Sequence, residues 1–326
     1  MFQQEIINEI VEKSLMSLKW DMQPQNLYEP VEYILSIGGK HLRPGLCLTS
    51  FNLFNDNISQ TVVWPAVALE IFHQFTLLHD DIMDKSDTRR GRPTVHCKWN
   101  ENAAILSGDL MSIYAYRFLS QGPADKIPAL LKAFNEMAVA VCEGQQKDMD
   151  FESMPFITMG DYIDMISQKT GALIACSACM GAIMAGASED KCKAMYDFGM
   201  NVGIAFQIMD DYLDTFGNAK IFGKPIGGDI ANNKKTWLLV ETIRRCVTES
   251  QKKRLEGILV KGGEEKEEKY NLMSGLYEEL GVKDDAAKAI QTYYEKAFAP
   301  LAPAGLNEDQ ISVLRDWAGK LVNREK

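Results

Sequence analysis

The chain has 326 residues, of which 46% are apolar and 25% charged, the balance of a globular protein with a large hydrophobic core. Its formal net charge of -10 argues against nucleic-acid binding, because no basic stripe is available to follow a phosphate backbone. The seven cysteines form no disulfide framework and no secretory leader is recognisable, so we expect a cytoplasmic protein with reduced thiols.

Apolar residues recur at helical spacing along most of the chain. The predicted helices span 3–19, 27–37, 44–55, 64–84, 101–120, 127–149, 159–187, 189–216, 234–258, 283–298 and 308–322. We expect loops at 85–94 and at the glycine-containing segment 218–233, and a solvated loop or a frayed helix end at the charged segment 261–269.

No segment has the alternating pattern of a β-strand. The longest uncharged run, 171–188, is rich in Ala, Gly, Ser and Cys, so we interpret it as a packed internal helix and predict no transmembrane segment. Its Cys176 and Cys179 form a lone CxxC pair, which favours core packing over a zinc site. We therefore predict an all-α fold in which residues 1–326 form one domain, a single large helical bundle.

Two acidic motifs share one spacing, Asp80-Asp81-Ile82-Met83-Asp84 and Asp210-Asp211-Tyr212-Leu213-Asp214. Residues four apart lie on one helix face, and like charges placed there repel each other. A divalent cation such as Mg²⁺, which takes oxygen ligands, would offset that repulsion. Two chance copies are expected in well under about 1% of chains of this length and average composition. Apolar residues precede both motifs, which favours inward-facing carboxylates over a solvated acidic surface.

Cationic residues accompany both motifs. They are Arg89 and Arg90 after the first motif, Lys169 before the small-residue helix, and Lys224 and Lys234 on either side of a Gly-Gly-Asp sequence. Lysines in such a loop are ordinarily just solvated. Beside two metal-binding stripes, however, they become candidate phosphate ligands.

In this order, the motifs resemble the trans-isoprenyl diphosphate synthases of the farnesyl and geranylgeranyl diphosphate synthase type. The matching residues run from 38 to about 237: Gly38-Gly39-Lys40, Arg43-Pro44, Glu70, His73, 80–84, 89–94, Gly144-Gln145, Asp148, Lys169-Thr170, 206–214, Gly223-Lys224, Gly228-Asp229 and Lys234. The resemblance implies an all-α bundle around a central cavity, the isoprenoid synthase fold, in a homodimer. It implies a Mg-dependent prenyltransferase that condenses isopentenyl diphosphate with an allylic diphosphate (dimethylallyl, geranyl or farnesyl).

The resemblance also assigns roles to residues. Three Mg²⁺ ions would be held by Asp80, Asp84, Asp148 and Asp210, supported by Asp81, Asp211 and Asp214. The allylic diphosphate would be bound by Arg89, Lys169, Thr170, Gln207, Lys224 and Lys234. Isopentenyl diphosphate, which binds without metal, would be held by Lys40, Arg43, His73 and Arg90. The departed diphosphate can take the proton that is lost, so no protein base is required.

Product length is expected to depend on Phe75 and Thr76, five and four residues before Asp80. In the family a bulky residue there implies a short product, and we expect fifteen to twenty carbons, with twenty preferred. Ideal helix geometry places Thr76 about 40° from Asp80 but Phe75 about 140° away, so an ordinary core role for Phe75 stays open. His41 departs from the family, which often has Arg or Gln there.

Four other functions compete with this one. A longer-chain polyprenyl diphosphate synthase would share every motif. A class I terpene cyclase would not need Lys40 and Arg43, a metal-dependent phosphohydrolase would need more histidines, and a non-catalytic subunit would be expected to have lost part of the site.

Overall fold

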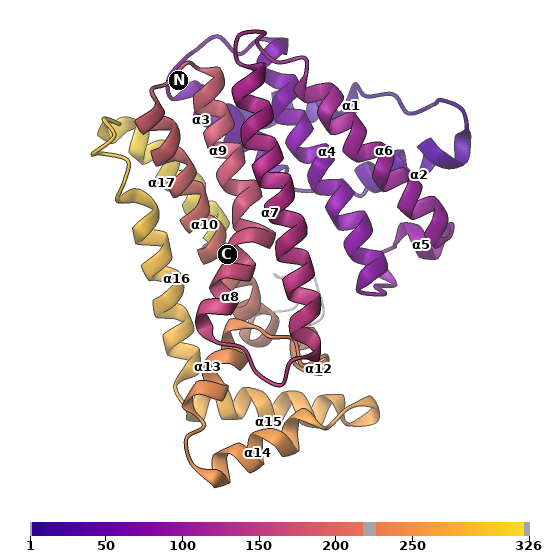
Figure 1. Ribbon diagram of the computed structural model, residues 1–326, viewed down its shortest axis with the longest axis vertical. Helices are drawn as coiled ribbons and strands as arrows, with labels where there is room; N and C mark the ends of the chain where they lie inside the picture. Colours follow the sequence, from indigo (N-terminus) through magenta and orange to yellow (C-terminus); the bar gives the residue numbers. More distant parts are fainter. Residues whose placement is uncertain (1, 218–225, 323–326) are drawn as a thin grey trace. The chain divides into compact units, whose positions relative to one another are not determined.

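The computed structural model describes residues 2–217 and 226–322, whose regular secondary structure is almost entirely helical (Figure 1). The prediction of an all-α fold is confirmed. The chain divides into two compact units, one comprising Met1–Glu136 and Cys176–Tyr196 and the other Met137–Ala175 and Asp197–Lys326. The prediction of a single domain stays a prediction.

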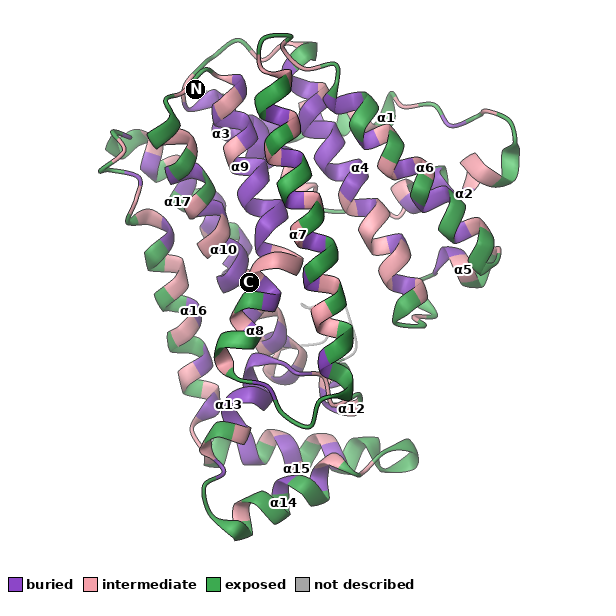
Figure 2. Ribbon diagram, in the orientation of Figure 1, coloured by how far each residue is buried: buried purple, intermediate pink, exposed green. Residues whose placement is uncertain are grey.

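The first unit contains eight complete elements among the described residues. They are α1 (Gln4–Met16), α2 (Gln25–Ser36), α3 (Leu42–Asn52), α4 (Gln60–Met83), β1 (Thr88–Arg89), β2 (Arg92–Pro93), α5 (Val95–Lys98) and α6 (Glu101–Leu119). Helix α4 packs along α6 and also contacts α3. Most of α3 is buried, as its colour in Figure 2 shows.

The second unit contains the remaining short helices and the C-terminal helices. They are α8 (Met159–Ile166), the π-helical turn η1 (Ser167–Gly171), α12 (Gly228–Ala231), α13 (Trp237–Arg245), α14 (Glu249–Leu259), the 3-10 turn η2 (Gly263–Glu265), α15 (Lys266–Glu279), α16 (Val282–Phe298) and α17 (Glu308–Val322). Three further helices contain the boundaries between the units: α7 (Ile127–Ser153), α9 (Ala172–Met184) and α10 (Glu189–Phe216).

The small-residue helix α9 is a core element. Cys176 is 1% exposed, as expected for core packing, and Ser50 on α3 donates a hydrogen bond to the carbonyl of Ala178 over 2.5 Å. Among the described residues, α4 alone is long and apolar enough to span a membrane. Because 67% of its most apolar window is buried inside the protein, that composition is explained by its place in the core.

The structure differs from the predicted helices and loops in several places. The segment predicted as one helix over 159–187 is interrupted by the π-turn η1, and the segment 234–258 is broken into α13 and α14. Thr248 starts α14 with a capping box that includes Gln251, which explains the break. The predicted loop 85–94 contains the β1–β2 hairpin, and the described part of the glycine-containing segment contains α12.

The largest difference is α15, which was not predicted at all. Its first residues fall in the charged segment 261–269, whose composition predicts a solvated loop or a frayed helix end. The helix is fixed by buried residues at helical spacing, including Met273, Leu276 and Tyr277, which only become its apolar face once the helix is formed.

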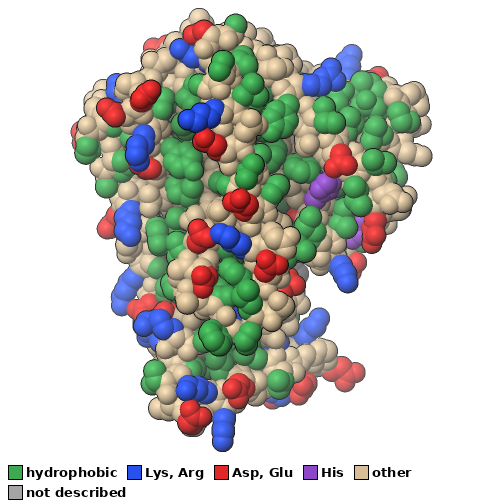
Figure 3. Space-filling view, in the orientation of Figure 1, with side chains coloured by type: hydrophobic (Ala, Val, Ile, Leu, Met, Phe, Trp, Pro, Cys, Tyr) green, Lys and Arg blue, Asp and Glu red, His purple; other side chains and the backbone are tan. Residues whose placement is uncertain are grey.

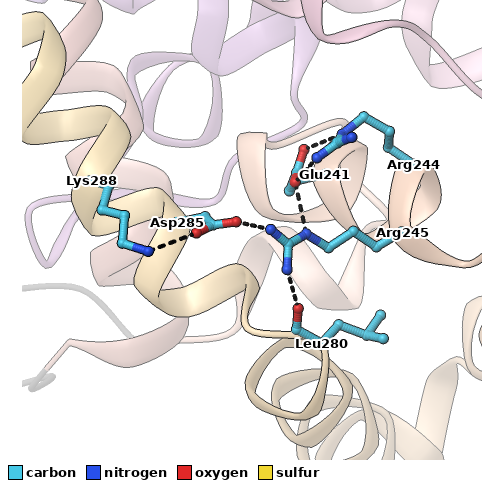
Figure 4. A network of polar contacts seen from close by, with 6 residues as sticks. All are labelled: Glu241, Arg244, Arg245, Leu280, Asp285 and Lys288. Atoms are coloured by element: carbon cyan, nitrogen blue, oxygen red, sulfur yellow. Dashed lines mark hydrogen bonds and ion pairs between the residues drawn. The ribbon is translucent and has the colours of Figure 1, made fainter.

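A network of ion pairs joins α13, α15 and α16 (Figure 4). Glu241 accepts from Arg244 and Arg245, at 2.8 Å in each case from the guanidinium Nε. Arg245 also bonds to the carbonyl of Leu280 at the end of α15 and pairs with Asp285 on α16. The C-terminal end of α15 is therefore fixed to both of its neighbours.

Candidate active site

The first acidic motif lies at the C-terminal end of α4, in the first unit. Asp81 is 3% exposed and accepts two hydrogen bonds from Arg89, from Nε over 2.9 Å and from Nη2 over 2.8 Å. Burial raises the pKa of Asp81, although Arg89 opposes that shift. The half-buried Asp80 and exposed Asp84 lie one turn apart on the same helix face. Asp81 thus holds Arg89 in place beside this carboxylate pair.

The β1–β2 hairpin brings Arg90 to the segment that precedes α3. Its two-residue turn is Arg90-Gly91, with φ of 50° and 73°. The guanidinium of Arg90 packs so tightly on Gly39 that a Cβ there would lie 2.8 Å from its Nη1. Any residue larger than glycine at position 39 would displace Arg90. Because Lys40 directly follows Gly39, this contact places the backbone of Lys40 close to Arg90.

Behind this contact lies a buried group of charged residues. Glu70 is 2% exposed, accepts from Gln74 over 2.8 Å and lies 3.2 Å from Nδ1 of His41. Burial alone would raise the pKa of Glu70, but the contact with His41 outweighs it and lowers the pKa to about 2. Burial lowers the pKa of Arg43 to about 10, which Glu70 opposes and Arg90 reinforces.

Three buried polar atoms in this group have no hydrogen-bond partner, Nδ1 of His41, Nε of Arg43 and Oε2 of Glu70. Buried polar atoms are ordinarily bonded, so an unbonded guanidinium nitrogen indicates a place for an acceptor. Burial lowers the pKa of His73 well below its ordinary value, which leaves the imidazole neutral. Arg43 and Arg90 can therefore bind an anion. Glu70 is the one carboxylate whose charge acts on the pKa values of both arginines.

The second acidic motif lies near the end of α10, in the second unit. Asp211 is 4% exposed and accepts three hydrogen bonds, from the Tyr162 hydroxyl over 2.7 Å, the Trp237 backbone N–H over 2.9 Å and the Gln207 amide over 3.0 Å. Burial raises the pKa of Asp211 to about 6 even though these donors oppose the shift. Its oxygens are used within the protein, which fits the supporting role given to it.

Residues of the π-turn η1 link this motif to α7. Thr170 donates to the Gln207 side chain over 2.9 Å, and Gln207 in turn bonds to Asp211. Lys169 donates to Asp148 over 2.5 Å. Burial would raise the pKa of Asp148, but Lys169 and Lys234 outweigh it and the pKa falls below its ordinary value. Hydrogen bonds and the charge of Lys234 thus link Asp148, Lys169, Thr170, Gln207 and Asp211 in one polar cluster.

Asp229 joins the same cluster through the backbone. Its N–H donates to the Asp214 carboxylate over 3.0 Å, and its own carbonyl accepts from the N–H of Lys234 over 3.0 Å. Burial raises the pKa of Asp229 to about 7, opposed by Lys234 and increased by the other aspartates of the cluster.

The pKa of Asp229 leads to a prediction for the metal-free protein. A carboxyl with a pKa raised above its unfolded value binds its proton more tightly in the folded state, so stability rises as pH falls through about 7. In EDTA, we expect the free energy of unfolding of the wild type to increase by about 1 kcal/mol from pH 8 to pH 6 relative to Asp229→Asn. Urea unfolding measures both proteins, and parallel pH profiles would contradict the shifted pKa.

The sequence analysis missed three parts of the site. Tyr162 and the Trp237 N–H bind Asp211, but neither is signalled by spacing, because the contacts depend on tertiary packing. Asp229 was visible in the Gly-Gly-Asp sequence but was given no role. Lys224 lies outside the described residues.

Phe75 lies in an aromatic group one turn before the first motif. Its ring contacts that of Phe72 edge-on at 5.3 Å and that of His79 at 4.9 Å between centroids. Thr76 donates its hydroxyl to the carbonyl of His73 over 2.8 Å. Phe75 is half-buried, a position compatible with either a wall or a core role.

The carboxylates fit magnesium that arrives with a phosphate ligand. Within residues 2–217 and 226–322, no three His, Cys, Asp or Glu side chains converge as a preformed metal cage. Mg²⁺ is usually bound by one or two carboxylates, with water and substrate phosphates completing its octahedron. Carboxylates one helical turn apart, such as Asp80 and Asp84, suit that mode.

Comparison with known proteins agrees with this donor set. Residues 24–276 match the family model described as polyprenyl synthetase. The chain is 37% identical over 302 residues to a geranylgeranyl diphosphate synthase of Sulfolobus acidocaldarius, covering 91% of this chain and 88% of that protein. It is 42% identical over 234 residues to a short chain isoprenyl diphosphate synthase of Methanocaldococcus jannaschii, covering 72% and 71%.

A solved structure of a geranylgeranyl pyrophosphate synthase superimposes with a TM-score of 0.93 at 39% identity, covering 100% of both chains. The fold is therefore the all-α isoprenoid synthase fold, as predicted. Enzymes of this family are prenyltransferases that generally depend on magnesium. Fold, aspartate motifs and similarity agree, and the chain belongs to the polyprenyl synthetase family of prenyltransferases.

Proposed function

We propose that the protein condenses isopentenyl diphosphate with an allylic diphosphate into a trans-prenyl diphosphate of fifteen to twenty carbons, with twenty preferred. The observation that carries the proposal is the pairing of two kinds of anion site. Arg89 pairs with Asp81 of the first motif and the charge of Lys234 acts on Asp211 of the second, whereas Arg43 and Arg90 have the single carboxylate of Glu70. One diphosphate would bind with metal and the other without it.

The proposal gives each group a task. Asp80, Asp84, Asp148 and Asp210 would hold the magnesium, for which we propose three ions, and Arg89, Lys169, Thr170, Gln207, Lys224 and Lys234 would hold the allylic diphosphate. Lys40, Arg43, His73 and Arg90 would hold isopentenyl diphosphate. Asp81, Asp211 and Asp214 would orient their neighbours, as the hydrogen bonds of Asp81 and Asp211 support.

The reaction begins when the carbon–oxygen bond of the allylic diphosphate breaks and negative charge develops on the leaving group. Magnesium, when bound, supplies Lewis-acid stabilisation of that charge. Arg89 and Lys169 add fixed positive charge, and each is held by a carboxylate (Asp81 and Asp148) so that little reorganisation is needed. The double bond of isopentenyl diphosphate attacks the allylic carbon, and the departed diphosphate accepts the proton that is lost.

Product length offers a test of the Phe75 assignment. If Phe75 closes the space for the growing chain, Phe75→Ala should shift the main product upward by at least one five-carbon unit. The control is Phe156→Ala, which removes an aromatic ring that is 68% exposed. Chromatography of the dephosphorylated products measures the distribution, and an unchanged distribution would assign Phe75 to the core instead.

We also propose a homodimer located in the cytoplasm, with residues 1–326 acting as one domain. Helix α6 exposes an apolar face that includes Leu106 and Ile113, each 58% exposed, and such a face favours association. Sedimentation of the purified protein would show twice the chain mass of 36.6 kDa, and a monomer would refute the dimer.

On the face drawn in Figure 3, acidic and basic side chains are interspersed, which gives a nucleic acid no continuous basic track.

The test of function uses purified protein, Mg²⁺, labelled isopentenyl diphosphate and one allylic starter at a time. We expect elongated product with dimethylallyl, geranyl or farnesyl diphosphate and none without a starter. Product without isopentenyl diphosphate would indicate a terpene cyclase, and phosphate release alone a phosphohydrolase. Products well beyond twenty carbons would indicate a longer-chain synthase, and complete inactivity a non-catalytic subunit.

A further inference from the structure

Helix α15 carries a buried lysine that the mechanism above does not use. Lys269 is 1% exposed, and its ammonium donates to the carbonyl of Ala231 over 3.2 Å. Among the described residues no carboxylate forms an ion pair with Lys269, and burial alone lowers its pKa. Lysine is rarely buried without an ion pair, because removing an ammonium group from water is costly. We therefore expect the buried ammonium to hold part of the chain in place. Its acceptor, Ala231, is the last residue of the short helix α12, which also contains Asp229.

The next residue of α15 makes a second contact of the same kind. Tyr270 donates its hydroxyl to the carbonyl of Thr215 over 2.7 Å, and Thr215 directly follows Asp214. Its ring also lies against Gly227, where a Cβ would stand 2.7 Å from Cδ2. Gly227 has a φ of 84°, so glycine is required there both by conformation and by the contact with Tyr270.

A third residue of α15 reaches the end of the same segment. The side chain of Tyr277 is buried, and that of Thr236, which caps α13 two residues after Lys234, lowers its pKa against the effect of burial. Lys269 therefore binds the chain just after Asp229, and Tyr270 binds it just after Asp214. The two aspartates are already joined, because the Asp229 N–H bonds to the Asp214 carboxylate.

From these contacts we propose that α15 braces the second acidic cluster, with Lys269 and Tyr270 as positioning residues that hold the Asp214 and Asp229 segments at a fixed separation for a magnesium-bound diphosphate. The brace is anchored at its other end, where Arg245 bonds to the carbonyl of Leu280 (Figure 4). The inference rests on the proposed function, since it concerns the ligand of the same cluster.

Because the charge of Lys269 is buried, a substitution can distinguish a positioning role from a role in stability. Lys269→Met keeps the length of the side chain but removes the desolvated ammonium, so the fold should be as stable as the wild type or more so. The bond to Ala231 is lost, however, and the α12 turn is then free to shift. A small displacement of groups that bind a reacting ligand can cost about a hundredfold in rate.

The experiment compares Lys269→Met and Tyr270→Phe with two matched controls. Lys266→Met alters an exposed lysine of the same helix, and Tyr294→Phe removes a hydroxyl that bonds to a backbone carbonyl on α17. Calorimetry measures the binding of inorganic diphosphate in the presence of Mg²⁺. Steady-state kinetics measure kcat and the KM for isopentenyl diphosphate, and thermal unfolding measures Tm without metal.

For both test variants we expect diphosphate binding in Mg²⁺ to weaken about tenfold and kcat to fall by about tenfold to a hundredfold. The KM for isopentenyl diphosphate should stay within about twofold, because Arg43 and Arg90 lie in the other unit. The Tm of Lys269→Met should equal or exceed that of the wild type, and Lys269→Arg, which keeps a donor, should recover part of the binding.

Diphosphate binding and kcat equal to the wild type in both variants would overturn the brace while leaving the proposed function intact. So would a loss of kcat that only follows a lower Tm, with unchanged diphosphate binding. If Lys269→Met does not fold, Tyr270→Phe decides the question, because it removes one oxygen atom. A wild type that neither binds the diphosphate nor makes product would overturn the proposed function and the brace together.

Discussion

Replacing Asp80 with asparagine is expected to reduce kcat by about a thousandfold, the largest effect that any substitution considered for this protein should have. Asp80 and Asp84 lie one turn apart at the end of α4, and the proposed metal needs their negative charge. Asparagine has the same shape but no charge, so a cation that binds between the two positions loses most of its attraction. The KM for isopentenyl diphosphate should change little, since that substrate binds without metal.

The matched control for this substitution is Asp87→Asn. Asp87 is an exposed carboxylate three residues beyond the motif, and its carboxylate contacts only the Cys97 thiol at 3.8 Å among the described interactions. We expect this control to keep kcat within about twofold. Thermal unfolding should show that both variants fold, because removing one of several neighbouring negative charges relieves repulsion. A kcat for Asp80→Asn near that of the control would exclude Asp80 from the metal site.

The second large effect is expected for Arg43→Met, on substrate affinity instead of kcat. Arg43 is half-buried with a buried, unbonded Nε, and Glu70 is the carboxylate whose charge acts on it. Charge-assisted hydrogen bonds contribute about 1.5–3 kcal/mol each, so the KM for isopentenyl diphosphate should rise about a hundredfold. The affinity for the allylic diphosphate should stay near the wild-type value, because its proposed ligands are other residues.

Arg117→Met is the control for Arg43→Met. The Arg117 guanidinium stacks over the Tyr114 ring at 4.5 Å on α6, away from the Arg43 group. The substitution of Arg43 also leaves Glu70 buried with fewer positive neighbours, so some loss of stability is expected and is measured separately by urea unfolding. Equal increases in the KM values of both substrates would show that Arg43 supports the fold and not one subsite.

The sequence was most informative where function imposes its own spacing. The motifs at 80–84 and 210–214 could be placed on helices because metal binding fixes residue type and interval together, and the family resemblance identified their neighbours Arg89, Lys169 and Gln207. The structure then adds which carboxylates are used internally: Asp81 by Arg89 and Asp211 by three donors.

Features that depend on packing could not be predicted in the same way. The π-turn at 167–171 adds one residue to a helix whose apolar pattern continues on both sides, so the pattern alone cannot reveal it. Helix α15 begins within a run of charges, and its buried face becomes apparent only against α12, α13 and α16. The contacts of Tyr162 and Lys269 join residues far apart in sequence, and no local signal marks them.

The most direct measurement is the mass of the product that the wild-type protein makes from isopentenyl diphosphate and an allylic starter in Mg²⁺. The account predicts a prenyl diphosphate one or more five-carbon units longer than the starter, reaching twenty carbons, and no product when EDTA replaces Mg²⁺. A protein that binds both diphosphates but forms no elongated product, or that forms it equally well in EDTA, would contradict the account.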